Sequence, residues 1–300
     1  MAPASKDRRG TEQRLAASRN LDCMTAAQVV RLMNREDRKV AIAVGRELPA
    51  IARAVDAIVA AMRGGGRLFY VGAGSSGRMA VLDAAECPPT FGISPKRMVA
   101  LIAGGRRAVT GAVEGAEDVT GNGRRDLRSH KLTRRDVVVG IAASGTTPYV
   151  LGALAYARRR GCVTVAVTSN REMPVAGLAK IVIAPEIGAE VLTGSTRLKA
   201  GTAQKMVLNM LSTAVMARLG YVYENLMIEA QMTNEKLWGR SLRILVDASG
   251  ADVSAAGRAL RAARHNMRVA LVMLKREVSA REAKTLLASA NDNLRIALRE

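Results

Sequence analysis

Short apolar runs alternate with longer amphipathic segments over residues 67–184 of this 300-residue chain. The apolar runs are 67–72, 98–103, 136–142, 162–168 and 180–184. Continuous runs of this length are typical of parallel strands that are buried on both faces, with the helical segments between them as crossover connections. The pattern therefore predicts an α/β fold with a doubly wound five-stranded parallel sheet.

Helical patterns flank the predicted sheet on both sides. Residues 1–22 have the composition of a polar arm, and Thr25 is a candidate N-cap for the helix that follows. An amphipathic pattern from Asp37 to Met62 predicts one longer helix that leads into the first strand. After residue 240 the apolar positions have helical spacing and no strand pattern occurs. We therefore predict two domains, residues 1–239 with the sheet and a helical arm, and residues 240–300 with helices alone.

The first predicted strand ends in a turn rich in glycine and serine, GAGSSG, and a helical pattern follows. At the start of a helix, unpaired backbone N–H groups and serine hydroxyls donate hydrogen bonds to anions. The spacing of Gly72, Gly74 and Gly77 fits G-x-G-x-x-G, but no acidic residue ends the next strand and no P-loop lysine follows the turn. The two serines among the glycines favour a bound phosphate, with Ser75 and Ser76 as its ligands, and a purely structural tight turn is the alternative interpretation.

Two later segments have the same hydroxyl-rich character. One follows the third predicted strand, and the other precedes a long helical pattern that has Arg197 and Lys199 at its start. In an open parallel sheet, ligands bind outside the carboxyl ends of the strands, where the strand order reverses. We therefore expect the three segments to approach one site. The predicted phosphate ligands are Ser75, Ser76, Ser144, Thr147 and Ser195.

Charge and composition restrict the classes of partner. The net charge is +20, basic side chains are distributed along the whole chain, and aromatic residues make up only 3%. Nucleic-acid-binding proteins concentrate positive charge on one face and interleave aromatic residues for single strands, so we expect no nucleic-acid partner. The N-terminal segment lacks the apolar core of a signal peptide, and no apolar run is long enough to span a membrane. Because the three cysteines are widely spaced and odd in number, we predict a reduced, cytoplasmic protein.

Carboxylates are the strongest candidates for chemistry. His130 and His265 lie in unrelated segments, and the chain has neither a zinc-binding spacing nor a serine-nucleophile motif, so we expect no metal and no other cofactor. Glu86 stands where two following prolines predict a helix end. The helix end and the apolar residues after it are expected to favour the neutral form of Glu86. A second acidic group, residues 114–118, follows the second strand, and either group would also suit a solvated helix end.

Long motifs spread over the chain resemble one family. They include GAGSSGRMAVLDAAECPPTFG, AVEGAED and EVLTGSTRLKAGTAQK. These segments are similar to those of the N-acetylmuramic acid 6-phosphate etherases, which belong to the sugar isomerase (SIS) superfamily and are related to the glucokinase regulatory protein. The resemblance extends from Thr11 and Glu12 to the helical tail, which is similar to a ubiquitin-associated domain.

This resemblance implies an activity. It implies cleavage of the D-lactyl ether of N-acetylmuramic acid 6-phosphate by elimination and hydration, giving N-acetylglucosamine 6-phosphate and D-lactate. It also implies a homodimer, a role in cytoplasmic cell-wall recycling and amino-sugar catabolism, and no metal. The acid glutamate of the family corresponds to Glu86 and its second active-site glutamate to Glu117. The chain departs from the family pattern at three places. Thr146 stands where the family usually has an arginine, Ser75 replaces a usual threonine, and residues 170–174 replace a shorter turn.

The residues leave two other functions open. An aldose–ketose isomerase of amino-sugar phosphates would use the same sheet and a base at C2, but it would release no lactate. A non-catalytic sugar-phosphate sensor would bind a partner protein or DNA, for which the helical tail and the basic surface are suited. Such a sensor would need neither Glu86 nor Glu117.

Overall fold

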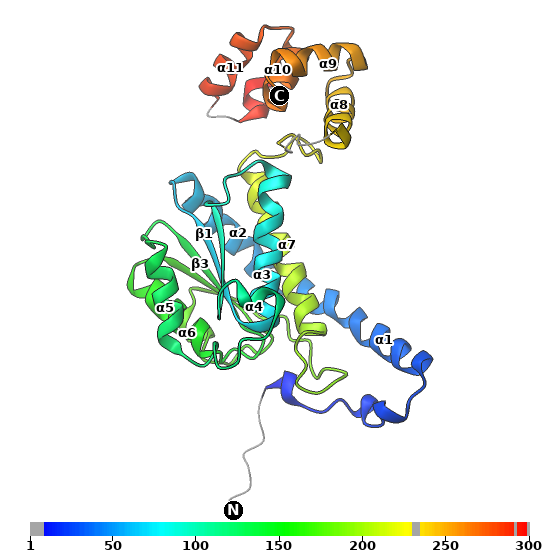
Figure 1. Ribbon diagram of the computed structural model, residues 1–300, viewed down its shortest axis with the longest axis vertical. Helices are drawn as coiled ribbons and strands as arrows, with labels where there is room; N and C mark the ends of the chain where they lie inside the picture. Colours follow the sequence, from blue (N-terminus) through cyan, green and yellow to red (C-terminus); the bar gives the residue numbers. More distant parts are fainter. Residues whose placement is uncertain (1–8, 230–234, 291–292, 299–300) are drawn as a thin grey trace, which may run out of the picture. The chain divides into compact units, whose positions relative to one another are not determined.

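The computed structural model describes residues 9–229, 235–290 and 293–298 (Figure 1). The chain divides into two compact units. The first contains residues up to Ala84 together with Lys96–Ser212, and the second contains Ala85–Pro95 together with residues from Thr213 onward. The predicted boundary between residues 239 and 240 falls inside helix α8 (Glu235–Ser249), and the division into domains at that point stays a prediction.

The first unit is built on a five-stranded sheet. All neighbouring strands are parallel, in the order β2-β1-β3-β4-β5. Every residue of β1 and β3 is buried, as expected for the inner strands of a parallel sheet. The predicted fold class is confirmed, and each strand agrees with its predicted range to within one residue at each end. The strands are β1 (Leu68–Gly72), β2 (Met98–Ile102), β3 (Val137–Ile141), β4 (Val163–Val167) and β5 (Ile181–Ile183).

The strand order reverses between β1 and β3. From β1 the chain crosses to β2 on one side, then returns to β3 on the other side and continues outward to β4 and β5. Gly72, the last residue of β1, lies beside Ile102 of β2 and Ile141 of β3. The carboxyl ends of these three strands are therefore level, and the loops that follow them begin side by side.

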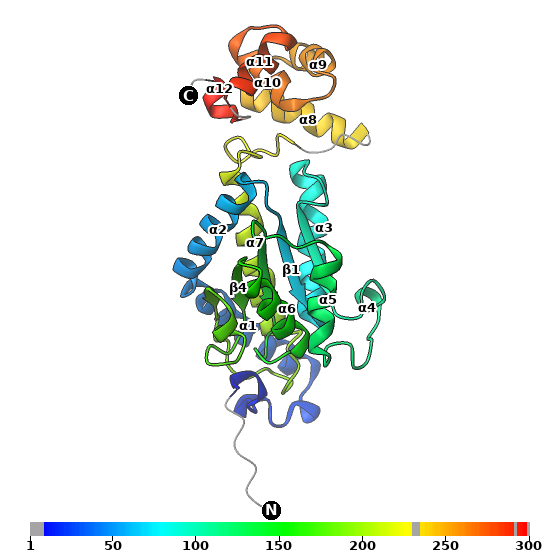
Figure 2. The ribbon, with the colours of Figure 1, turned by 90° about the vertical axis from the view of Figure 1, so that its left-hand side faces the viewer.

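Helices cover both faces of the sheet. Helices α5 (Thr120–Ser129) and α6 (Pro148–Arg159) pack together on one face, and α2 (Leu48–Arg63) lies on the other face against β3 and β5 (Figure 2). Helices α3 (Gly74–Phe91) and α7 (Lys199–Arg218) meet where Ser212 Oγ donates to Asp83 Oδ1 at 2.9 Å. The other helical elements of this unit are η1 (Gly10–Glu12), η2 (Ala16–Ser18), η3 (Leu21–Cys23), α1 (Ala26–Gly45), α4 (Arg107–Thr110) and η4 (Ala176–Leu178).

The amphipathic pattern before the sheet forms two helices. Helix α1 begins at the predicted cap, where the Thr25 side chain accepts from the Gln28 N–H and the Gln28 side chain accepts from the Thr25 N–H. It ends at Gly45, and α2 begins at Leu48. The prediction of one helix over 37–62 is wrong, because Pro49 lacks the N–H that would continue α1 and suits the first turn of a new helix instead.

Helix α3 continues past Glu86, where the sequence pattern predicted its end. Pro88 and Pro89 lie inside the helix, which ends at Phe91. The prolines remove two backbone donors, but their carbonyls still accept hydrogen bonds, and the N–H of Gly92 donates to the Pro88 carbonyl at 2.9 Å. Gly92 has a φ of 65°, the left-handed conformation in which glycine commonly terminates helices. The predicted helix end at Glu86 is therefore wrong.

In the second unit, short helices follow one another over the described part of the tail. They are α8, α9 (Val253–Ala262), α10 (Met267–Arg276), α11 (Ala280–Ser289) and α12 (Leu294–Leu298). Asp252, Asn266 and Ser279 cap α9, α10 and α11 by accepting a backbone N–H in the first turn. The apolar faces enclose one buried cluster, which includes Leu260 and Leu271. The expected helical character of this tail is confirmed for the described residues.

The N-terminal arm is described from residue 9, so that residues 1–8 of the predicted polar arm lie outside the described residues. The rest of the arm forms the three short 3-10 turns η1, η2 and η3. Across the described ranges, the structure contains no helix with both the length and the apolar character needed to cross a membrane.

Candidate active site

The turn between β1 and α3 has the geometry of an anion site. Gly74 is exposed, has a φ of 51°, and has open space where a side chain would begin. The first backbone hydrogen bond of the helix runs from the Gly77 N–H to the Ala73 carbonyl at 3.0 Å, so the N–H groups of residues 74–76 precede the helical ladder. Ser75 is half-buried in this turn and Ser76 is 8% exposed. The turn therefore offers both N–H and hydroxyl donors to an anion.

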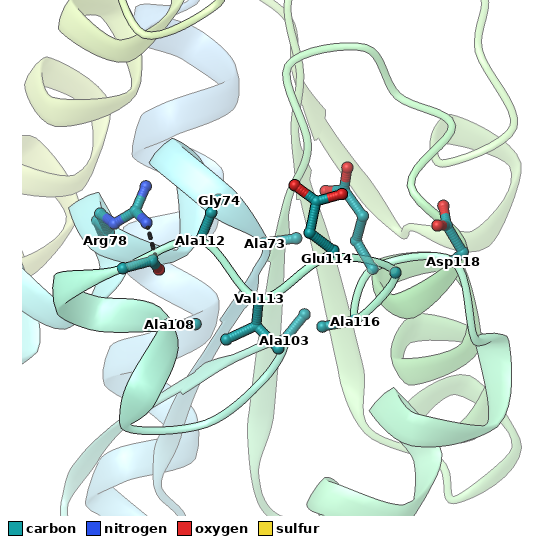
Figure 3. Close-up of a pocket in the computed structure, with 13 residues that line it drawn as sticks. Ala73, Gly74, Arg78, Ala103, Ala108, Ala112, Val113, Glu114, Ala116 and Asp118 are labelled. Carbon is teal, nitrogen blue, oxygen red and sulfur yellow. Dashed lines mark hydrogen bonds between the residues drawn. The ribbon is translucent and has the colours of Figure 1, made fainter.

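A cavity of about 390 Å³ opens beside this turn (Figure 3). The loop that follows β2 forms most of its wall and contributes three carboxylates, those of Glu114, Glu117 and Asp118. Ala73, Gly74 and Arg78 line the cavity from the other side. Glu117 is exposed, and so are its two acidic neighbours. The predicted acidic group thus lies at the same edge of the sheet as the predicted anion turn.

Two hydrogen-bonded contacts hold the loop that carries Glu117. Arg78 Nε donates to the Val109 carbonyl at 3.1 Å, and Arg78 Nη2 donates to the Gly111 carbonyl at 2.9 Å. At the other end of the loop, the backbone N–H of Tyr149 donates to the Glu117 carbonyl at 3.0 Å. No sequence pattern indicated Arg78, because its partners lie more than 30 residues away in the chain and share no motif with it.

The hydroxyls after β3 form a local network. Ser144 Oγ accepts from the Thr146 N–H at 3.2 Å and from Thr146 Oγ1 at 3.1 Å. Thr147 is the N-cap of α6, and its side chain makes no capping hydrogen bond. All three residues are half-buried. Thr146, at the position where the family usually has an arginine, thus orients the hydroxyl of Ser144.

The N-terminal arm reaches the same edge of the sheet. The Gly10 N–H donates to Asn170 Oδ1 at 2.8 Å, and Asn170 Nδ2 donates to the Ala143 carbonyl at 2.9 Å. A Cβ placed on Gly194 would lie 3.5 Å from Glu12 Oε2, so the Glu12 carboxylate lies against the loop that contains Ser195. The arm therefore bridges two of the three predicted polar segments, a role that its polar composition did not reveal.

The start of α7 differs from the expected polar approach to the site. The carboxylate of Glu190, fully buried, accepts the backbone N–H groups of Lys199 at 3.0 Å and Ala200 at 2.9 Å. Burial raises the pKa of Glu190, although these hydrogen bonds and the charge of Lys199 oppose the rise. Lys199 Nζ forms a buried ion pair with Glu36 Oε2 at 3.0 Å. Lys199 is therefore a structural residue, and half-buried Ser195 is the predicted ligand that remains beside this helix start.

The structure assigns the two predicted catalytic glutamates to different units. Glu117 belongs to the first unit and Glu86 to the second. The side chain of Glu86 is exposed, five residues before the end of α3. The expectation that apolar neighbours and a helix end surround Glu86 is wrong, because the helix continues and leaves this position on its solvent face.

Asp83 is a buried acid that no sequence pattern distinguished. Its side chain is 8% exposed, and burial raises its pKa to about 6. Hydrogen bonds from Ser212 and Tyr70 and the charge of Lys205 act in the opposite direction. The Leu-Asp-Ala-Ala-Glu-Cys motif contains this residue, but nothing in the motif indicates which of its two acids faces the core. In the described ranges, no three His, Cys, Asp or Glu side chains lie together as ligands for a metal ion.

Comparisons with known proteins identify the family of this chain. The glucokinase regulatory protein N-terminal SIS domain matches residues 50–158, and the SIS domain matches residues 121–214. Proteins named N-acetylmuramic acid 6-phosphate etherase from Pectobacterium atrosepticum and Serratia proteamaculans are 50% and 51% identical to this chain over 288 residues. The alignments cover 96% of this chain and 95% and 97% of those two proteins. The chain belongs to the N-acetylmuramic acid 6-phosphate etherase family.

The etherase motifs named from the sequence account for the main loops at the sheet edge. One supplies the turn after β1, a second supplies the three carboxylates of the cavity, and a third supplies Ser195 and the buried Lys199. The predicted resemblance is confirmed. Among solved structures, a putative phosphosugar isomerase involved in capsule formation from Bacteroides fragilis is similar, with a TM-score of 0.51 and 22% identity. That likeness covers 70% of this chain and 98% of the other and shows the shared fold.

Proposed function

We propose that this chain cleaves the D-lactyl ether of N-acetylmuramic acid 6-phosphate, giving N-acetylglucosamine 6-phosphate and D-lactate. The relatives that carry the etherase name support this substrate and reaction. The observation that carries the proposal is the cavity that joins Gly74, the first residue of α3, to the carboxylate of Glu117. An anion turn beside an exposed carboxylate suits a sugar phosphate that must lose a proton.

The phosphate group is bound, in this proposal, by the hydroxyl-rich loops at the sheet edge. The N–H groups of residues 74–76 and the hydroxyls of Ser75 and Ser76 contribute from the start of α3. Ser144, Thr147 and Ser195 contribute from the two other segments. Hydrogen bonds from hydroxyls and backbone N–H groups to a phosphate are charge-assisted, and the helix dipole adds to their strength.

The chemistry divides into an elimination and a hydration. In the open-chain sugar, the aldehyde at C1 acidifies the hydrogen on C2, and Glu117 removes that hydrogen as a general base. The C3–O bond then breaks, the electron pair goes to the lactate oxygen, and Glu86 supplies the proton that this oxygen needs. Water then adds its hydroxyl to C3 of the unsaturated aldehyde and gives its proton to Glu86, while Glu117 returns a proton to C2. Each positioned proton transfer contributes roughly 10²–10⁴ in rate. Glu86 takes the acid role here from the family correspondence, since its exposed side chain lacks the burial first expected.

We further propose a cytoplasmic homodimer that acts in cell-wall recycling. Apolar side chains on α1 and at the start of α2 support self-association, because Val30, Ile42 and Leu48 are 60%, 62% and 50% exposed. In this proposal the dimer interface covers these side chains. Analytical ultracentrifugation tests the dimer, and a monomer at micromolar concentration would contradict it.

Incubation with N-acetylmuramic acid 6-phosphate followed by an enzymatic D-lactate assay tests the reaction. We expect stoichiometric D-lactate and N-acetylglucosamine 6-phosphate, and little turnover of N-acetylmuramic acid without phosphate. Conversion of an amino-sugar phosphate into its ketose without lactate would instead show an isomerase. Binding of the phosphorylated sugar with no chemical change would show a sensor.

A further inference from the structure

Arg78 occupies a fixed position at the wall of the cavity. It lies in the second turn of α3 and is half-buried. Two of its donors are committed to the carbonyls of Val109 and Gly111, at 3.1 and 2.9 Å. Its Nη1 has no hydrogen-bond partner in the described part of the chain. An arginine held by two backbone carbonyls presents its remaining donors in a fixed direction, which lowers the entropy lost when it binds a ligand.

The charges around Arg78 favour an anionic ligand at this position. Among the described residues that line the cavity, Arg78 carries the single positive charge, whereas Glu114, Glu117 and Asp118 are acidic. In Figure 3 the guanidinium of Arg78 and the carboxylates of Glu114 and Asp118 extend to the same side of the loop. None of these carboxylates forms an ion pair with Arg78 within the described residues. If a ligand carries a second anionic group besides its phosphate, that group would be repelled by the three carboxylates of the cavity. Arg78 supplies the positive charge that offsets this repulsion.

We infer that Arg78 binds the carboxylate of the lactyl group and thereby selects sugars that carry this ether. This inference rests on the proposed function, since the substrate then has two anionic groups, a phosphate on C6 and a carboxylate on the C3 substituent. The N–H groups and hydroxyls of the anion turn are assigned to the phosphate. Arg78 lies four residues after Gly74, or about 6 Å along the helix, a separation that one open-chain sugar can span.

The guanidinium also suits a carboxylate chemically. Planar, paired N–H groups match the two oxygens of a carboxylate, and such charge-assisted bonds are among the strongest in proteins. Holding the leaving group would keep C3 and its neighbour C2 beside the loop of Glu117. Arg78 is thus a specificity-determining residue, in contact with the part of the substrate that becomes lactate.

Two substrates distinguish a contact between Arg78 and the lactyl carboxylate from a role in which Arg78 only holds the loop of Glu117. The first is N-acetylmuramic acid 6-phosphate, and the second is the 3-O-isopropyl ether of N-acetylglucosamine 6-phosphate, in which a methyl group replaces the carboxylate. For Arg78→Met we expect kcat/KM to fall at least ~10²-fold more for the lactyl ether than for the isopropyl ether, with Arg78→Lys intermediate. Arg107→Met is the control, because Arg107 is exposed at the start of α4, in the same connection between β2 and α5, and does not line the cavity. The Arg107→Met variant should leave the ratio of kcat/KM for the lactyl ether to kcat/KM for the isopropyl ether unchanged.

A parallel fall with both ethers would overturn the inference, since it would mean that Arg78 only supports the loop. If Arg78→Met does not fold, inhibition of the unaltered protein decides the question. D-lactate should then inhibit turnover of the isopropyl ether at least ~10-fold more strongly than neutral D-lactamide, whereas equal inhibition would refute the carboxylate contact. Failure of the unaltered protein to release lactate would refute the proposed function itself, a distinct outcome.

Discussion

The backbone carbonyl of Glu117 accepts a hydrogen bond from the backbone N–H of Tyr149, with 3.0 Å between the two atoms. Tyr149 is the second residue of α6, so this bond ties the loop of the proposed base to the helix that follows the Ser144 loop. This hydrogen bond depends on close packing of α5 and α6. A Cβ placed on Gly152 would lie 1.9 Å from the carbonyl oxygen of Thr120, immediately after that loop.

Substitution of Gly152 by alanine should therefore disturb both stability and activity. The added methyl group must push α5 and α6 apart, at a cost of roughly 1–3 kcal/mol in the free energy of unfolding. We expect kcat/KM to fall as well, because the Glu117 loop moves with α5. Gly121→Ala is the matched control, since a Cβ there meets nothing within 4 Å and alanine favours the helix. Urea unfolding and lactate release measure the two effects, and an unchanged kcat/KM in Gly152→Ala would contradict the proposed coupling.

The roles of the two glutamates can be separated by hydrogen exchange. In deuterated water, Glu86→Gln should still exchange the C2 hydrogen of the substrate while it releases little lactate, because the base remains and the acid is lost. Glu117→Gln should do neither. Mass spectrometry of recovered substrate measures the exchange, and Glu277→Gln, an exposed position at the end of α10, is the control.

Two other patterns would contradict this assignment. Exchange that survives in Glu117→Gln and is absent in Glu86→Gln would invert the roles of acid and base. Exchange in neither variant would mean that the two carboxylates act as one coupled unit, whose individual contributions do not add.

The serine ligands predict a change in substrate binding. We expect the double variant Ser76→Ala, Ser144→Ala to raise KM by ~10²-fold or more, because each hydrogen bond to a charged group is worth roughly 1.5–3 kcal/mol. Steady-state kinetics of lactate release measure KM directly. Ser129→Ala is the control, since its exposed hydroxyl donates to the Asp126 carbonyl at the end of α5. The same KM in the double variant and in the unaltered protein would refute the assignment.

Asp83 predicts a dependence of stability on pH. Its pKa of about 6 in the folded chain lies above the ordinary value of 3.8, so the folded state holds the proton more tightly. The stabilisation from this group is complete below pH 3.8 and is lost as the pH rises through 6. The amide introduced by Asp83→Asn stays neutral at every pH. This variant should therefore gain ~2 kcal/mol relative to the unaltered protein between about pH 4.5 and 7.5.

Urea unfolding at the two pH values tests this expectation. Ser212→Ala should have the opposite effect. In the unaltered protein the hydrogen bond from Ser212 lowers the pKa of Asp83, so its removal should raise that pKa further. Its stability should therefore fall more steeply with rising pH. A constant difference in stability between Asp83→Asn and the unaltered protein would mean that burial does not raise the pKa of Asp83.

The fold class and several local features follow from the sequence alone. The five apolar runs predict the strands because a chain buried on both faces admits few polar residues. Thr25 predicts the start of α1 because its hydroxyl satisfies a backbone N–H that the helix leaves unpaired. The long etherase motifs predict the family, and with it the pair Glu86 and Glu117. Each of these features depends on residues that are close together in the chain.

Tertiary structure decided where these residues lie and what they contact. The level carboxyl ends of β1, β2 and β3 depend on strand register, which no single segment specifies. Arg78 finds its carbonyl partners 31 and 33 residues away, and Lys199 finds Glu36 at a separation of 163 residues. The exposure of Glu86 depends on a helix that continues through two prolines. Side-chain environment is a property of packing between distant segments, so local patterns identified the reactive residue types but not their burial or their partners.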